Sequence, residues 1–154
     1  MKKLIFLLLI TVPFIGFGQN NLGTWYEYSG WLLVGNWVDN EEDGLFQYYF
    51  ENDINSQVQK EGVYKNGKPI GLWKEYYENG NTKKNKDWTN EIWRYYKDNG
   101  KLEKVLILKN GLKDFLFYYY YENGQLKWEG REANFVTIWE KCWDENGTEI
   151  ECEE

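Results

Sequence analysis

The sequence of 154 residues contains no histidine and only two serines, Ser29 and Ser56. Histidine is the usual general base near neutral pH and the commonest protein ligand of metals, so its absence excludes every catalytic scheme and metal site built on imidazole. A serine triad loses its base for the same reason. The two cysteines are too few to build a structural zinc site by themselves. We therefore expect a protein that is not an enzyme and that uses no metal and no cofactor.

Carboxylates are abundant, but the sequence singles out no pair of them for catalysis. There are 25 Asp and Glu against 18 Lys and Arg, which gives a formal net charge of −7. The acidic run at 39–43 lacks the ligand spacing of an EF-hand loop. Such an acidic chain is a poor partner for nucleic acid or an anionic lipid surface. We interpret its one basic cluster, Lys83, Lys84 and Lys86, as a solvated strand face.

Long apolar runs are also absent, with one exception at the N-terminus. Lys2 and Lys3 precede an apolar run over 4–17, which ends in the small-residue site Gly16-Phe17-Gly18. This layout is typical of a secretory signal peptide, and the run is shorter than the ~20 residues that span a membrane. We predict a signal peptide over 1–18 and a periplasmic or secreted protein, cleaved after Gly18 and not stably inserted in a membrane. An uncleaved anchor and a buried core strand are the alternatives.

Proline is scarce, and asparagine followed by glycine marks the turns instead. Asn-Gly is a strong hairpin signal because both residues tolerate a positive φ. It occurs at residues 66–67, 79–80, 99–100, 110–111, 123–124 and 146–147. Weaker turn candidates at Asp39-Asn40, Asn52-Asp53, Thr89-Asn90 and Ala133-Asn134 lie between them. The segments between turns are rich in aromatic and β-branched residues, as in strands, and they are too short for a crossover helix.

The sequence therefore predicts an all-β fold, an antiparallel up-and-down meander of roughly ten to twelve strands. Whether the sheet is open or closes on itself is left undecided. Alternate turns belong to a longer repeat in which an aliphatic residue and an aromatic one precede a Tyr and the turn. The aligned copies are 44–53, 71–80, 91–100 and 115–124, with a fifth ending at 146–147. We divide the chain into the signal peptide 1–18, an atypical capping segment 19–43 and tandem hairpin repeats over 44–154.

The segments GVYKNGKPIGLWKEYYENG (62–80) and FLFYYYYENGQLKWEG (115–130) carry a resemblance to a known repeat. They resemble the MORN repeat variant, which is found in antitoxin-like proteins of the YwqK type. The resemblance covers about two-thirds of the chain, from Gly44 to Gly147. It implies an elongated single sheet of hairpins, often exported, and it implies no catalytic residues. The polar segment 81–90 departs from the pattern.

Side-chain alternation predicts two different faces of the sheet. We expect Trp73, Trp93 and Phe117 to form an aromatic row, because equivalent residues of successive hairpins lie two strands apart. We predict that the aromatic face is the binding face. Its candidate residues are Trp73, Tyr77, Trp93, Phe117, Tyr119 and Tyr121. The opposite face, with Leu45, Leu72, Ile92 and Leu116, is expected to be the packed one. We also expect a three-residue loop with a glycine bulge, which pairs Tyr120 with Leu126 and Tyr96 with Leu102.

The two cysteines, Cys142 and Cys152, flank the last turn. The oxidising conditions outside the cytoplasm favour a disulfide between them, and two free thiols are the alternative.

The functional hypothesis is a non-enzymatic, exported scaffold that binds another protein through a sheet face. A carbohydrate-binding envelope module is the runner-up. A toxin–antitoxin role follows from the family resemblance but conflicts with the predicted export.

Overall fold

The structure is a computed structural model that describes residues 24–28, 31–35, 37–38, 41–50, 56–109 and 113–152. The predicted signal peptide, 1–18, lies outside these residues. So do the turns expected at Asp39-Asn40, Asn52-Asp53 and Asn110-Gly111. Within the described part of the chain, no helix is long and apolar enough to cross a membrane.

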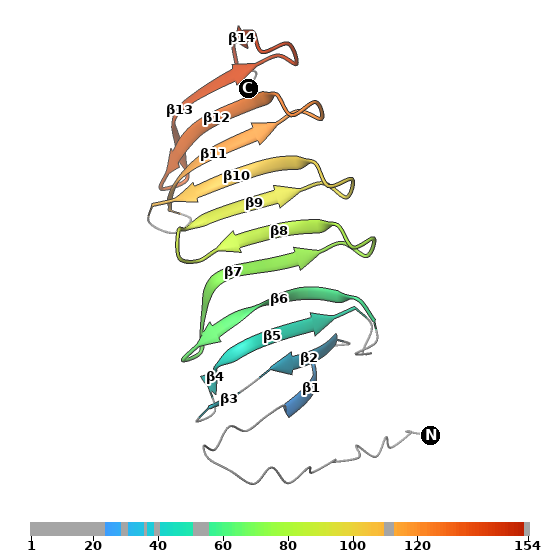
Figure 1. The fold of residues 1–154 in the computed structure, drawn as a ribbon. Coiled ribbons are helices and arrows are strands. Elements are labelled where there is room, and N and C mark those ends of the chain that lie inside the picture. Colours follow the sequence, from blue (N-terminus) through green and yellow to red (C-terminus); the bar gives the residue numbers. More distant parts are fainter. Residues whose placement is uncertain are drawn as a thin grey trace, which may run out of the picture.

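All but two of the described strands form one large antiparallel sheet in meander order (Figure 1). Its twelve strands are β1 (Thr24–Tyr28), β2 (Trp31–Gly35), β5 (Gly44–Tyr49), β6 (Val58–Lys65), β7 (Lys68–Tyr76), β8 (Thr82–Asp87), β9 (Ile92–Tyr96), β10 (Leu102–Leu108), β11 (Asp114–Tyr120), β12 (Leu126–Ala133), β13 (Val136–Trp143) and β14 (Glu149–Ile150). Each strand pairs with its neighbour in this order, and β1 and β14 lie at opposite ends of the stack (Figure 1). The predicted up-and-down meander is confirmed, and the sheet is open.

The segment predicted as an atypical cap extends this sheet and adds a short ribbon beside it. Strands β1 and β2 continue the meander, whereas β3 (Trp37–Val38) and β4 (Glu41–Glu42) pair only with each other. The ribbon contacts the turn between β6 and β7, where the N–H of Gly67 donates a hydrogen bond to the carbonyl of Glu42 at 3.0 Å.

The turns at one edge of the sheet repeat the same geometry four times. In the β7–β8 turn, the Tyr77 carbonyl accepts the N–H of Gly80 at 3.0 Å, and the Tyr77 N–H donates to the carbonyl of Asn81 at 2.8 Å. The same two bonds recur around Lys97, Tyr121 and Asp144. The four turn glycines have φ between 83° and 87°, a region that is costly for residues with a Cβ. The predicted loop is therefore confirmed, and Tyr96 pairs with Leu102 and Tyr120 with Leu126.

The buried core of the described sheet comprises Phe46, Tyr49, Trp73, Leu106, Leu108 and Phe117, and three of its aromatic side chains each pack on a glycine of a neighbouring strand. Phe46, Trp73 and Phe117 are 0%, 3% and 4% exposed. A Cβ added to Gly35 would lie 2.4 Å from the Phe46 ring, one on Gly62 2.0 Å from Trp73, and one on Gly130 2.4 Å from Phe117. The missing side chains let the rings lie flat against the backbone, which buries them without a second sheet.

The prediction that the aliphatic face is the packed one was wrong. Leu45 and Leu72 are 54% and 48% exposed, while the aromatic residues that follow them in sequence, Phe46 and Trp73, are buried. The physical reason is that the glycines lie on the aromatic side of the sheet. A ring can cover the backbone of a strand that carries glycine, whereas the aliphatic residues have no such surface beneath them.

Candidate binding face

The predicted aromatic row is present, and strand register shows what lies between its members. Trp73 pairs with Lys86, Lys86 with Trp93, Trp93 with Leu106, and Leu106 with Phe117. Trp73 and Trp93 are therefore two strands apart, as are Trp93 and Phe117. Lys86 and Leu106 lie between these rings. Elsewhere the rings of Phe46, Trp73 and Phe117 lie next to a glycine of the neighbouring strand.

A second row runs beside the first on the same face, and it alternates lysine with other side chains. Register connects its members from strand to strand. They are Tyr48, Lys60, Glu75, Lys84, Tyr95, Lys104 and Tyr119. The lysines lie on β6, β8 and β10, the second strand of successive hairpins. Together with Lys86, these two rows form the lysine–aromatic face.

Each lysine of this face lies over an aromatic ring. The Lys60 Nζ is 5.0 Å from the centroid of Trp73, and that of Lys84 is 5.1 Å from Tyr95. The Lys104 Nζ lies 4.4 Å from Tyr95 on its other side. A cation within about 6 Å of a ring centroid is attracted by the ring's quadrupole. The rings thus hold the ammonium groups in place on the sheet.

Three of these four cations have no carboxylate partner in the described part of the chain. Lys84 forms an ion pair with Glu75 at 3.2 Å, whereas Lys60, Lys86 and Lys104 contact aromatic rings instead. Burial lowers the pKa of the Lys86 amine, and the nearby Lys84 charge lowers it further. An excess of positive charge is therefore concentrated on one face of a protein whose net charge is −7.

The predicted binding residues occupy three different environments. Trp73 and Phe117 are buried and form the floor of the face. Trp93 and Tyr119 are partly exposed and lie close to the lysines. Burial raises the pKa of the Tyr119 hydroxyl, which stays protonated at neutral pH.

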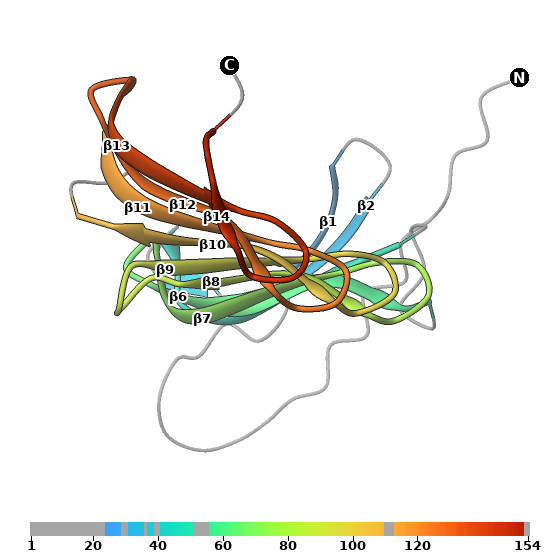
Figure 2. The same cartoon turned by 90° about the horizontal axis from the view of Figure 1, so that it is seen from above.

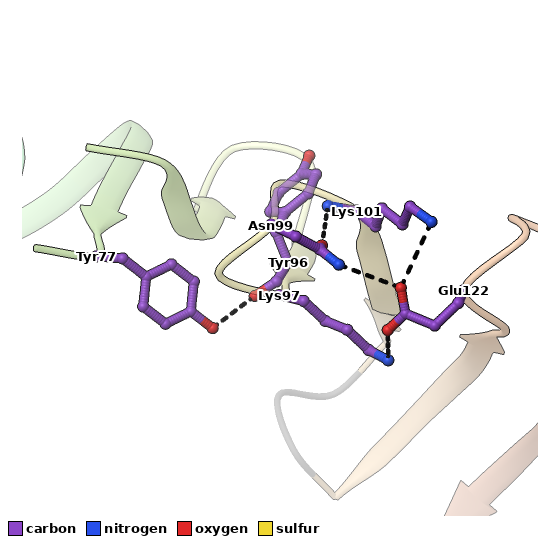
Figure 3. Close-up of polar contacts among 6 residues, drawn as sticks. All are labelled: Tyr77, Tyr96, Lys97, Asn99, Lys101 and Glu122. Atoms are coloured by element: carbon purple, nitrogen blue, oxygen red, sulfur yellow. Dashed lines mark hydrogen bonds and ion pairs between the residues drawn. The ribbon is translucent and has the colours of Figure 1, made fainter. Parts of the chain in front are cut away.

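Tyr77 and Tyr121 lie at the turn edge, where they tie each hairpin to the next one. The Tyr77 Oη donates to the carbonyl of Tyr96 at 2.8 Å (Figure 3). The Tyr121 Oη donates to the carbonyl of Trp143 at 2.9 Å in the same way. Their hydroxyls are therefore engaged in linking neighbouring turns.

Between these two tyrosines, the equivalent position is Lys97, and an ion-pair cluster replaces the hydroxyl contact. Glu122 from the β11–β12 turn reaches back to Lys97, Asn99 and Lys101 of the preceding turn (Figure 3). The Lys97 and Lys101 ammonium groups and the Asn99 amide all contact this one carboxylate, and they lower its pKa. The cluster is exposed, so it adds little stability. Its effect is to fix the position of one turn relative to the next.

The C-terminal end of the sheet, at β13 and β14, contains the two cysteines and a cavity. Cys142 and Cys152 are joined by a disulfide, with their Cα atoms 5.3 Å apart, and the bond closes the hairpin that ends in β14. A cavity of about 460 Å³ lies against it. It is lined by Tyr121, Lys127, Trp128, Glu140, Trp143, Ile150 and the disulfide itself, among others.

Sequence reasoning missed the lysines as part of a site. It interpreted Lys83, Lys84 and Lys86 as a solvated strand face, whereas the structure places Lys84 and Lys86 over aromatic rings. A usable signal was present, because Lys84 and Lys104 both stand four residues after a turn glycine. The sequence alone does not show that Lys84 and Lys104 lie on the same face as Trp73.

No protein-family model matches the chain, and no curated protein resembles it.

Proposed function

We propose that this protein is a non-enzymatic, exported repeat scaffold that binds an acidic protein partner through its lysine–aromatic face. The observation that carries the proposal is the set of four lysines over aromatic rings, of which Lys60, Lys86 and Lys104 have no carboxylate partner in the described structure. An acidic partner would supply the missing negative charges. The resemblance to MORN-type repeats supports a scaffold role.

The charge distribution favours an acidic partner over a neutral one. A positive face attracts a negative surface over distance, even on a protein whose net charge is negative. The half-buried rings beneath the lysines add apolar contact area with little entropy to lose, because each has few rotatable bonds. Charge would therefore steer the encounter, and the rings would hold the complex.

Two features support the proposed export. The N-terminal run has the layout of a signal peptide, and the disulfide between Cys142 and Cys152 suits an oxidising compartment. Export argues against an intracellular antitoxin role, which follows only from the family resemblance.

The test compares the proteins that wild type and variants capture from an envelope extract. The variant Lys60→Gln/Lys84→Gln/Lys104→Gln removes the cations, and Lys74→Gln removes a lysine from the opposite face of β7. We expect the triple variant to lose an acidic partner that wild type and Lys74→Gln retain. Equal capture by all three proteins would refute the proposed face.

The C-terminal cavity favours a second candidate, carbohydrate binding. Trp128 and Trp143 offer flat apolar rings, and the nearby Glu140 carboxylate already accepts the Trp128 indole N–H at 2.9 Å. Rings beside polar groups are typical of small-ligand sites. Binding on a glycan array that is lost in Trp143→Ala but kept in the triple lysine variant would favour this function.

A further inference from the structure

We infer that the lysine–aromatic face recognises a polyproline II segment that carries an acidic residue at every third position. The inference rests on the proposed function and names the chemistry of its partner.

The spacing of the lysines is the first argument. Lys60, Lys84 and Lys104 lie on alternate strands and are connected in register through Glu75 and Tyr95. Neighbouring strands are about 4.7–4.9 Å apart, so successive lysines stand about 9.4–9.8 Å apart along the row. A polyproline II helix has three residues per turn and rises about 3.1 Å per residue. Every third side chain therefore returns to the same side after about 9.3 Å, which matches the lysine spacing.

Other regular segments fit this spacing less well. Residues seven apart on an α-helix share a face after about 10.5 Å, so a helix would drift by about 1 Å at each lysine. Side chains on one face of a β-strand are about 6.6–6.8 Å apart, so after one that meets a lysine the next would lie between two lysines.

The direction of the row is the second argument. Strands β6 to β10 largely overlie one another when the sheet is seen from above, and the strand direction turns further towards β13 (Figure 2). Lys60, Lys84 and Lys104 belong to one register row, so they lie on the same face of the sheet. A straight segment that crosses these strands can therefore meet all three lysines.

The rings between the lysines are the third argument. Tyr95 lies between Lys84 and Lys104, and both ammonium groups are within 5.1 Å of its ring centroid. Tyr119 lies beyond Lys104, 5.4 Å from its ammonium. Aromatic-lined surfaces bind polyproline II segments because the peptide is already extended and its rings pack on the aromatic side chains. Here the rings would contact the peptide backbone between successive acidic residues.

Glu75 occupies the position between Lys60 and Lys84 and pairs with Lys84. It orients Lys84 in the free protein and competes with an incoming carboxylate. Its removal should therefore strengthen binding, an effect opposite to that of removing a lysine.

The experiment measures the affinity of the purified protein for synthetic peptides at low salt. The probe is a peptide of repeated Pro-Pro-Glu triplets. The matched controls have the same composition with all Glu clustered at one end, or Gln in place of Glu. We expect the periodic peptide to bind at least tenfold more tightly than either control, with an affinity that falls as salt is added.

Variants test which residues read the peptide. Lys60→Gln, Lys84→Gln and Lys104→Gln should each weaken binding about two- to fivefold, the range of exposed ion pairs. Glu75→Gln should strengthen it by a similar factor, and Lys74→Gln on the opposite face should leave it unchanged. A thermal melt of each variant shows that it is folded.

The inference is overturned if the clustered peptide binds as tightly as the periodic one, because the face would then respond to charge alone. It is equally overturned if an acidic helical peptide or an acidic polysaccharide binds more tightly than the Pro-Pro-Glu peptide. If capture of the extract partner depends on the lysines while the periodic peptide does not bind, only this inference fails. If the periodic peptide does not bind and the capture does not depend on the lysines either, both this inference and the proposed function fail.

Discussion

The indole of Trp73 lies so close over Gly62 that a methyl group on this glycine would come within 2.0 Å of the ring. The ring is fixed in that place by a bond from its Nε1 to the carbonyl of Val63, 3.1 Å long. The two residues come from adjacent strands, β6 and β7, so the contact also holds the register between these strands.

Gly62→Ala should destabilise the fold by about 1–3 kcal/mol, because the added methyl group overpacks the contact with Trp73. Trp73→Ala should cost about 3–5 kcal/mol by removing a buried ring. The double variant should cost less than the sum, since the smaller side chain at 73 leaves room for the methyl group at 62. Urea unfolding of the three variants measures this coupling, and additive costs would show that the ring does not rest on Gly62.

The two faces of the sheet should respond differently to truncation. Phe117→Ala removes a ring that is almost fully buried and should cost about 3–5 kcal/mol. Leu72→Ala removes a side chain that is half exposed and should cost less than about 1 kcal/mol. Denaturant midpoints of both variants decide the matter. A larger loss in Leu72→Ala would mean that the aliphatic face is the packed one.

Stability should fall at alkaline pH, in part through Tyr76. Its Oη donates to Glu61 Oε1 at 2.8 Å, and burial together with this carboxylate raises the pKa of Tyr76 from 10.0 to about 12. The unfolded chain therefore loses this proton first. The contribution is complete below pH 10 and is lost as the pH rises towards about 12.

Denaturant unfolding as a function of pH, with tyrosinate absorbance, follows this loss. Tyr76→Phe should cost about 1 kcal/mol at neutral pH through the missing hydrogen bond, and it should show a smaller alkaline decline. Glu61→Gln is the matched control, because it keeps the tyrosine and removes the charge that raises its pKa. An alkaline decline of equal size in wild type and Tyr76→Phe would contradict the assignment.

The disulfide between Cys142 and Cys152 should stabilise the terminal hairpin. It closes a short loop, with a sequence separation of 10, which corresponds to about 2.5–3 kcal/mol in the chain-entropy model. Cys142→Ser/Cys152→Ser should lower the free energy of unfolding by that amount. Thiol titration of the unfolded, unreduced protein should find no free thiol; two free thiols would show that the bond is not formed.

Export should remove residues 1–18 and leave Gln19 at the new N-terminus. Mass spectrometry of protein recovered from the periplasm or the medium measures this directly. An intact chain beginning at Met1 in the cytosol would contradict the predicted export.

Local rules determined much of this fold from the sequence alone. Each Glu-Asn-Gly or Asp-Asn-Gly turn reverses the chain within a few residues, because Gly80, Gly100 and Gly124 adopt a positive φ at little cost. The loop type then sets the register of the flanking strands, such as Tyr120 with Leu126. Strand order follows without further information, since connections this short allow only neighbouring antiparallel strands.

The tertiary structure alone decided which face is packed and where charge gathers. Both faces carry large side chains, so alternation along one strand cannot rank them. Burial depends on what lies on the neighbouring strand, as where Gly62 makes room for Trp73. The lysine row depends on register in the same way, because Lys60, Lys84 and Lys104 are far apart in sequence and meet only across the sheet. Local sequence therefore determines the hairpins, and cross-strand packing determines their two surfaces.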